Sequence, residues 1–388
     1  MNLEKALINK KKVKSEDGHI PVLDGVRGLA IVMVMVFHLV GTYAQNPNVS
    51  SVVRMLQFTS IGQKGVDLFF VLSGFLITGI LLRTKSKEKY FINFYARRSL
   101  RIFPLYFAVL SLCLIAGYVW NLRQYSFGQM WPYFMYANNL LTSFHILELR
   151  GPSHFWSLAV EEHFYLIWPL MVYCLSKRQL LLLSLFTFIF PVPLRYLMHI
   201  HGFDSFSFTL CRVDALALGA GLAVIFHDQG DAWEKTKKIA WKISIPISIA
   251  GFLSYFLLSG THAPILQAWK FSLFSLICGV VLVLSLSHHH LNPLPIVLCQ
   301  AWLRRLGRVS YGLYVFHPFV FFFAMGSIYR PSYGPVVLRT APILLLEISF
   351  AFALTLGLAL ASWKYFEEPI LRLKSKFGGI RSEFVECK

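Results

Sequence analysis

The sequence predicts an all-α membrane protein that crosses the bilayer ten times and keeps both termini in the cytoplasm. Of its 388 residues, 56% are hydrophobic and 14% are charged, whereas a soluble domain carries about 25% charged residues. Most of the 37 Lys and Arg residues fall at the two ends of the chain and in alternate loops. This asymmetry follows the positive-inside rule. The formal net charge of +18 therefore points to contact with anionic membrane lipids and not to nucleic-acid binding.

Ten apolar segments account for most of the chain. They are residues 22–44, 65–82, 102–120, 156–175, 180–198, 208–226, 243–258, 267–287, 309–327 and 342–363. We divide the chain into a basic cytoplasmic segment (1–21), a ten-helix membrane domain (22–366) and a cytoplasmic tail (367–388). Residues 1–20 lack the apolar core of a cleavable signal peptide, so none is expected.

Neither a disulfide framework nor a metal site is expected. The six Cys residues lie at irregular spacings, mostly inside apolar segments, and form no CxxC pair. The run His288–His290 follows the end of a predicted span and lies in a predicted cytoplasmic loop. We therefore assign it no metal.

The first span carries two residues that are unusual inside a bilayer, Arg27 and His38. Eleven positions separate them, which on a helix is three turns plus roughly 20°, so both are expected on one face. They would lie about 16–17 Å apart along the helix axis. Polar residues at membrane depth usually face a cavity or a partner. The structural alternative is that Arg27 extends to the cytoplasmic interface and His38 bonds a neighbouring helix.

The second and third spans add further polar groups. Asp67 lies near the outer end of the second span, and Ser73 lies midway along it. Arg98 and Arg101, three positions apart, share a face at the entrance to the third span. They suit either lipid headgroups or a phosphate site, since a guanidinium fork binds phosphate well.

The fourth span places carboxylates inside the bilayer. Ser157, Glu161 and Tyr165 recur every four residues and are expected on one face, with Glu162 beside them. Two carboxylates at this depth need partners or a water-filled cavity, unless they are solvated at the interface.

The sixth and ninth spans carry the remaining candidates. Arg212 and Asp214 lie just inside the outer end of the sixth span, where a structural ion pair is favoured, with Asp67 or the glutamates as further partners. In the ninth span, His317 precedes Pro318, which leaves a backbone carbonyl without its helical hydrogen bond. His317 either bonds that region or joins the site.

Sorted by depth, these groups outline a polar passage through the membrane. The inner group is Arg27, Arg98 and Arg101. The outer group is His38, Asp67, Glu161, Glu162, Arg212 and Asp214. A basic inner entrance below a chamber of histidine and carboxylates suits a cytoplasmic donor with phosphates and a long, thin arm.

Six stretches resemble, in order, the motifs of the membrane-bound acyltransferase-3 family. They are LDGVRGLAIVMVMVFH, GVDLFFVLSGFLIT, FYARRSLRIFPLY, FWSLAVEEHFYLIWP, RVDALALGA and SYGLYVFHP. The resemblance covers residues 22–370 and implies ten spans in a bacterial cytoplasmic (inner) membrane. Many members also have a soluble esterase-like domain after the membrane part. We expect this chain to lack one, so a second step would need another protein.

The resemblance also implies an activity. The donor is acyl-CoA, by default acetyl-CoA, and the acceptor is a sugar hydroxyl outside the membrane. The acceptor belongs to lipopolysaccharide, exopolysaccharide or another oligosaccharide or glycolipid. His38 is implied as the catalytic residue and Arg27 as its essential companion, while Arg98 and Arg101 meet the CoA phosphates. The chain departs from the family at His163, where Gln is usual, so hydrogen bonding there is expected to differ.

The chemistry of acyl transfer agrees with these roles. A sugar hydroxyl is a weak nucleophile, and His38 is suited to take its proton near neutral pH. We expect Glu161 or Glu162 to orient or charge-stabilise His38, and Arg27 to hold the donor or stabilise developing negative charge. A covalent acyl-His38 relay is the competing mechanism.

Two other classes of function remain open from the residues alone. A flippase or transporter of a lipid-linked saccharide would also need buried charges, but inverted repeats are common in such carriers and none is found here. A transporter leaves the mass of its product unchanged, whereas an acyltransferase adds the acyl mass. A membrane scaffold without catalytic activity would tolerate His38→Ala.

Overall fold

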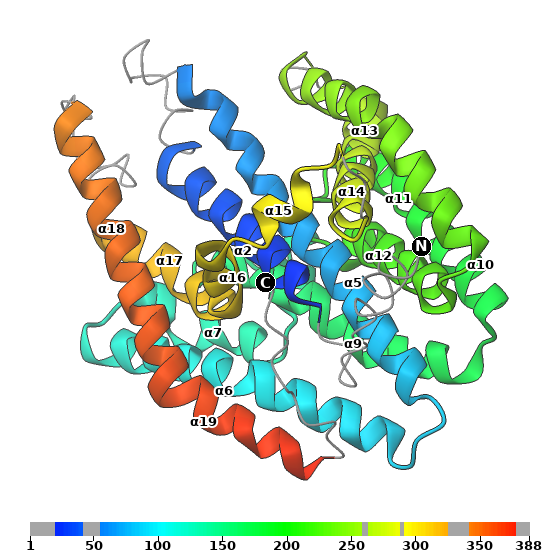
Figure 1. Cartoon of the computed structure of the whole chain (residues 1–388). Coiled ribbons are helices and arrows are strands. Elements are labelled where there is room, and N and C mark those ends of the chain that lie inside the picture. Colours follow the sequence, from blue (N-terminus) through cyan, green and yellow to red (C-terminus); the bar gives the residue numbers. More distant parts are fainter. Residues whose placement is uncertain (1–19, 42–54, 258–262, 288–290, 325–340, 378–388) are drawn as a thin grey trace.

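The computed structural model describes residues 20–41, 55–257, 263–287, 291–324 and 341–377, and every regular element in these ranges is a helix (Figure 1). The all-α prediction is therefore confirmed for the described part of the chain. The run His288–His290 and most of the predicted N-terminal segment lie outside the described residues, as do residues 378–388 of the tail.

The helices differ widely in length. The α-helices are α2 (Pro21–Val36), α5 (Gly65–Thr84), α6 (Tyr90–Val119), α7 (Phe127–Phe134), α8 (Asn138–Ser143), α9 (Trp156–Cys174), α10 (Lys177–Ile189), α11 (Pro191–Ile200), α12 (Thr209–Asp228), α13 (Asp231–Leu257), α14 (Pro264–Ser285), α15 (Leu294–Leu298), α16 (Ala301–Arg308), α17 (Ser310–Ala324), α18 (Ala341–Ser362) and α19 (Glu368–Leu371). Two π-helical segments, Phe37–Gly41 and Trp363–Glu367, continue α2 and α18. Short 3-10 helices occupy Met55–Lys64, Arg123–Tyr125, Ser153–Phe155 and Arg372–Lys376.

Seven helical segments in the described ranges are long and apolar enough to cross a membrane. They are Pro21–Val40, Phe58–Thr84, Tyr90–Val119, Lys177–Ile200, Thr209–Asp228, Pro264–Ser285 and Leu345–Lys376. The chain is therefore a multi-pass integral membrane protein. The other three expected spans coincide with α9, α13 and α17, of which α9 carries two glutamates and α17 is described over 15 residues. The count of ten spans and the cytoplasmic termini stay predictions.

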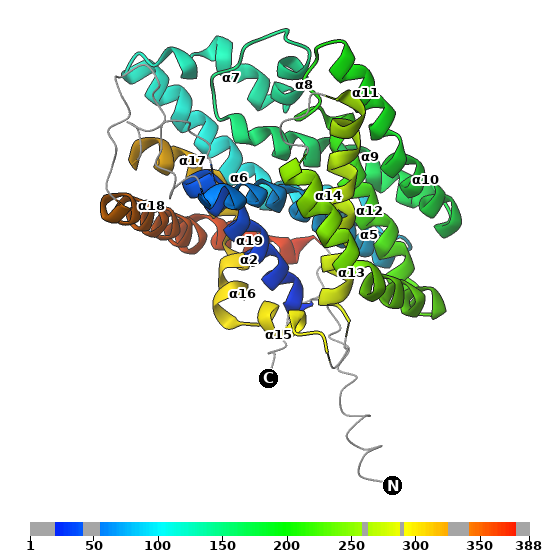
Figure 2. The same cartoon turned by 90° about the horizontal axis from the view of Figure 1, so that it is seen from above.

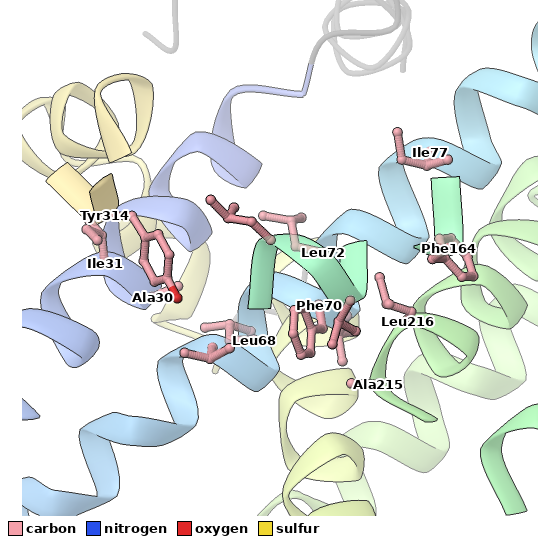
Figure 3. Packing of buried hydrophobic residues seen from close by; sticks show 14 of the residues in the cluster. Ala30, Ile31, Leu68, Phe70, Leu72, Ile77, Phe164, Ala215, Leu216 and Tyr314 are labelled. Carbon is pink, nitrogen blue, oxygen red and sulfur yellow. The ribbon is translucent and has the colours of Figure 1, made fainter. Parts of the chain in front are cut away.

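Helix α5 lies inside the bundle and packs against α12 and α2 (Figures 1 and 2). Figure 3 shows side chains of α5, among them Leu68, Phe70 and Leu72, between those of α2 and α12. In a bilayer such packing is stabilised by van der Waals contact and close helix approach, because lipid is as apolar as the side chains. At Gly74 a Cβ atom would lie 1.9 Å from the carbonyl oxygen of Leu216, so only glycine permits this approach of α5 to α12.

Helices α15 and α16 were not expected from the sequence, which indicated only a loop there. Both pack against α2, the helix of Arg27 and His38. At Gly28 a Cβ atom would lie 2.1 Å from the carbonyl oxygen of Leu303 in α16, so the two backbones are in contact. This contact fixes the N-terminal half of α2.

The third span starts earlier than predicted. Helix α6 begins at Tyr90, so residues 90–101, which we expected in a cytoplasmic loop, are helical. The stretch has no Gly or Pro before Pro104, and aromatic and basic residues recur in it at helical spacing. The correction matters for the site, because Arg98 and Arg101 lie on a long helix and not on a loop.

Two other predictions of local structure had different outcomes. The fifth span, predicted as one helix over 180–198, consists of α10 and α11, which are separate because a helix restarts at Pro191. The aromatic run in the loop 121–155 fits either an interfacial or a re-entrant helix. The structure has helix α7 there, and its place relative to the membrane stays a prediction.

Candidate functional site

A cavity that is partly open to solvent lies among α2, α5, α6, α9 and α17, which can be followed in Figures 1 and 2. Its empty space, open solvent included, is about 800 Å³. Five of the residues predicted from the sequence line it: Arg27, Ser73, Arg98, Arg101 and Glu161. They come from four helices, so folding has brought together groups that are distant along the chain. The cavity is the candidate site.

Three guanidinium groups dominate the charge of the cavity. The Arg98 guanidinium carbon lies 4.7 Å from the ring centroid of Tyr165, and that of Arg101 lies 5.8 Å from the ring of Trp363. Stacking on aromatic faces holds a guanidinium group in place while its N–H donors stay directed at other acceptors. The third, Arg27, donates from Nη1 to Asp24 Oδ1 over 2.8 Å. The arrangement suits a phosphate-bearing ligand.

Glu161 is the carboxylate among the described lining residues. It accepts a hydrogen bond of 2.5 Å from Ser73 Oγ, which ties α9 to α5. Ser157 and Tyr165 line the same cavity, so the predicted face of α9 is formed. Glu162 does not line it, and its buried Oε1 has no hydrogen-bond partner among the described atoms. The structure thus separates the two adjacent glutamates.

His38 lies in the π-helical segment that continues α2 and does not line the cavity. Its Nδ1 is 2.9 Å from the carbonyl oxygen of Val34 and 3.3 Å from Nε2 of His317 in α17. A π-helical turn changes the direction of the side chains that follow, and such turns are frequent at functional sites. Arg27 lines the cavity together with Tyr311 of α17, whereas His38 contacts α17 through His317 and is not part of the lining. That Arg27 and His38 share one helix face stays a prediction.

Tyr314 connects the cavity to the histidines. It lines the cavity, and its backbone carbonyl is 2.8 Å from Nδ1 of His317. The Tyr314 hydroxyl donates to the carbonyl oxygen of His154 over 2.8 Å and shares a hydrogen bond of 2.5 Å with Ser157 Oγ. Helix α17, which carries Tyr314, packs against α2. One turn of α17 thus joins a residue of the cavity lining, Tyr314, to the residue that contacts His38, His317.

His154 lies next to this wall, in the 3-10 turn before α9. Its ring centroid is 5.7 Å from that of His317. Burial, together with the neighbouring His38, lowers the pKa of His154 to about 3, so this imidazole is neutral near pH 7.

Three of the residues predicted near the outer side, Asp67, Arg212 and Asp214, form ion pairs and do not line the cavity. Arg212 donates to Asp67 Oδ1 over 2.5 Å, and Lys64 Nζ lies 3.6 Å from Asp67 Oδ2. Asp214 pairs with Arg195. The sequence did not determine which residues pair with Arg212 and Asp214. The structure pairs them with Asp67 and Arg195.

We expect the Asp67–Arg212 pair to stabilise the fold without contacting a ligand. Replacing Arg212 with Met should destabilise the protein by up to about 3–5 kcal/mol, because the buried Asp67 carboxylate loses its hydrogen-bonded partner and keeps only Lys64, 3.6 Å away. The double variant Asp67→Asn/Arg212→Met should recover part of that loss. Thermal unfolding in lipid nanodiscs measures both. A large change in the KM for an acyl donor, in a variant that unfolds like the wild type, would show that the pair acts in the site.

Sequence reasoning missed three residues that shape these clusters. Tyr314 lies in the SYGLYVFHP stretch, but its spacing from His317 was not used. Arg195 is a charged residue inside an apolar segment, which by itself demands a partner. Glu367 is buried beside Gly312, where a Cβ would lie 3.1 Å from its Oε1, and Ser362 donates to that oxygen over 3.0 Å.

The comparison with known proteins agrees with the motifs. The family described as "Acyltransferase domain" (acyltransferase-3) matches residues 20–364. The chain belongs to the acyltransferase-3 family. No solved structure matches the chain.

Named relatives of the acyltransferase-3 chain are bacterial O-acetyltransferases. Peptidoglycan O-acetyltransferase OatA of Listeria monocytogenes is 28% identical over 371 residues, which are 88% of this chain and 56% of the relative. O-acetyltransferase OatA of Staphylococcus aureus is 27% identical over 91% of this chain and 57% of its own length. The putative peptidoglycan O-acetyltransferase YrhL of Bacillus subtilis is 28% identical over 86% and 54%. The chain thus spans little more than half the length of these relatives.

Proposed function

We propose that the protein moves an acetyl group from cytoplasmic acetyl-CoA to a hydroxyl of a cell-envelope glycan, with His38 as general base. The observation that carries the proposal is the cavity lined by Arg27, Arg98 and Arg101, one wall of which leads through Tyr314 to the histidines. The names of the relatives make acetyl the preferred acyl group.

The residues of the cavity fit the donor. The phosphates of CoA carry the charge that three guanidinium groups bind best, by charge-assisted and bidentate hydrogen bonds. The apolar part of the lining, which includes Phe69 and Leu72, suits the uncharged pantetheine arm. Glu161 and Asp24 offset part of the cationic charge, which keeps the empty cavity from being destabilised by repulsion among the arginines.

In the proposed reaction His38 accepts the proton of the sugar hydroxyl as its oxygen attacks the thioester carbonyl. The tetrahedral intermediate then collapses, the C–S bond breaks, and the protonated His38 returns the proton to the leaving thiolate. The products are an O-acetyl ester and free CoA, and the base is restored. Arg27 holds the donor in the cavity, beside the face of α17 that His38 contacts.

The acceptor is the least constrained part of the proposal. Two of the relatives are named for peptidoglycan, which makes the sugar hydroxyls of a cell-wall polymer the first acceptor to test. Lipopolysaccharide and exopolysaccharide have the same reacting group, so the transfer chemistry is unchanged for them.

The proposal is tested by supplying purified protein in proteoliposomes with acetyl-CoA that carries a ¹³C-labelled acetyl group and with isolated envelope glycans. Mass spectrometry should find the labelled acetyl mass on the glycan and free CoA in equal amount. A glycan that crosses the membrane with its mass unchanged would contradict the proposal and favour transport. A labelled acetyl group trapped on His38 when acceptor is left out would replace the direct route with a covalent relay.

A further inference from the structure

The contact between His317 and His38 defines the protonation of both rings. Nδ1 of His317 lies 3.1 Å from the carbonyl oxygen of Leu313 and 2.8 Å from that of Tyr314. A carbonyl oxygen only accepts hydrogen bonds, so this nitrogen carries the proton. In a neutral imidazole the other nitrogen, Nε2, then has a lone pair. His317 is fully buried, and a charge there would be costly.

The same reasoning fixes His38. Its Nδ1 lies 2.9 Å from the carbonyl oxygen of Val34 and 3.3 Å from His317 Nε2, the nitrogen that has the lone pair. Both neighbours accept, so Nδ1 of His38 is the N–H donor and Nε2 carries the lone pair. A general base needs its lone pair on the nitrogen that meets the substrate, and a wrong tautomer disables it even when the ring is correctly placed.

We propose that His317 is a positioning residue that holds the His38 ring with Nδ1 protonated, so that Nε2 is the proton-accepting atom. This inference rests on the proposed function, in which His38 is the base. It assigns the orienting role to a neutral imidazole on α17, whereas the sequence assigned that role to Glu161 or Glu162. The backbone carbonyls of Leu313 and Tyr314 in turn hold His317 in the required tautomer.

Two substitutions at His317 separate its two hydrogen bonds. In His317→Asn the side-chain amide still reaches the carbonyls of Leu313 and Tyr314 but has no atom at the position of Nε2, so His38 loses its acceptor. In His317→Gln the amide oxygen takes the place of Nε2 and accepts from His38 Nδ1. We therefore expect acetyl transfer to be impaired in H317N and retained in H317Q.

The tautomer is read directly by ¹⁵N NMR of histidine-labelled protein in lipid bilayers, with the His38 signals assigned by their loss in His38→Gln. The wild type and H317Q should show a protonated Nδ1 and a lone pair on Nε2, while H317N shows a mixture. The kcat for acetyl transfer should fall about 100-fold in H317N and less than about 10-fold in H317Q, with the KM for acetyl-CoA nearly unchanged.

The outcomes distinguish this inference from the proposed function. A wild-type spectrum in which His38 carries its proton on Nε2 overturns the inference without any variant, as does an H317N protein with wild-type tautomer and kcat. If H317N shifts the tautomer while His38→Ala keeps full activity, the positioning contact stands and the base assignment fails. If His38→Ala is inactive and H317N leaves spectrum and rate unchanged, the proposed function stands and the role of His317 fails.

Discussion

Replacement of His38 with alanine is expected to lower acetyl transfer by roughly 10²–10⁴-fold, because the acceptor hydroxyl then has no base. The loss should appear in kcat, since His38 does not line the donor cavity and its removal leaves Arg27, Arg98 and Arg101 in place. The assay is the release of CoA thiol from acetyl-CoA in proteoliposomes, in parallel with mass spectrometry of the glycan.

A matched imidazole elsewhere in the membrane domain provides the control. His163 accepts or donates a hydrogen bond of 2.7 Å with Thr209 and does not line the cavity. In His163→Gln the amide can replace that bond, so activity should stay within about threefold of the wild type. Activity of His38→Ala equal to that of His163→Gln would remove His38 from the mechanism.

The second large effect is expected at the arginines of α6. Removing the guanidinium of Arg98 or Arg101 should raise the KM for acetyl-CoA about 10–100-fold, since a hydrogen bond to a charged group contributes about 1.5–3 kcal/mol. The double variant should have a still higher KM for acetyl-CoA, whereas kcat at saturating donor should change little. Lysine at either position should restore part of the affinity, because it keeps the charge but loses the planar fork.

Arg97 and a donor without nucleotide phosphates provide two controls for this test. Arg97 lies on the same helix but donates from Nε to the carbonyl oxygen of Phe377 over 2.9 Å and does not line the cavity, so Arg97→Ala should keep a near-normal KM. Acetyl-pantetheine has no nucleotide phosphates, so its KM should be similar in the wild type and in Arg98→Ala/Arg101→Ala. A variant that loses both donors equally would point to a general defect of the fold.

Much of the architecture follows from the sequence, because composition and hydrophobic run length are local properties. Seven of the ten predicted spans reappear as helices with membrane-spanning length and composition in the described residues. The misplaced start of α6 shows the limit of that approach. Charged residues at 97–101 look like a cytoplasmic loop until the partners Tyr165 and Trp363 are known, because each aromatic ring is supplied by another part of the chain.

The candidate site was predicted only in part, because the sequence shows which residues are charged but not which side chains meet. Arg27, Arg98 and Arg101 were selected by charge at membrane depth, which one sequence reveals, and they do meet in one cavity. The partner of His38 was not predictable, since both the π-helical turn after Val36 and the approach of His317 depend on how α2 packs against α17. The ion pairs were also predicted only in part. The sequence shows which charged residues lie in apolar segments, but which of them pair depends on the fold.

The most direct test of the account is a structure of the protein in a lipid bilayer with a non-transferable acetyl-CoA analogue. We expect the phosphates to contact Arg98 and Arg101, the pantetheine arm to occupy the cavity, and the carbonyl carbon of the thioester to stop beside Nε2 of His38. A donor bound outside this cavity, or one whose thioester ends away from His38, would contradict the account.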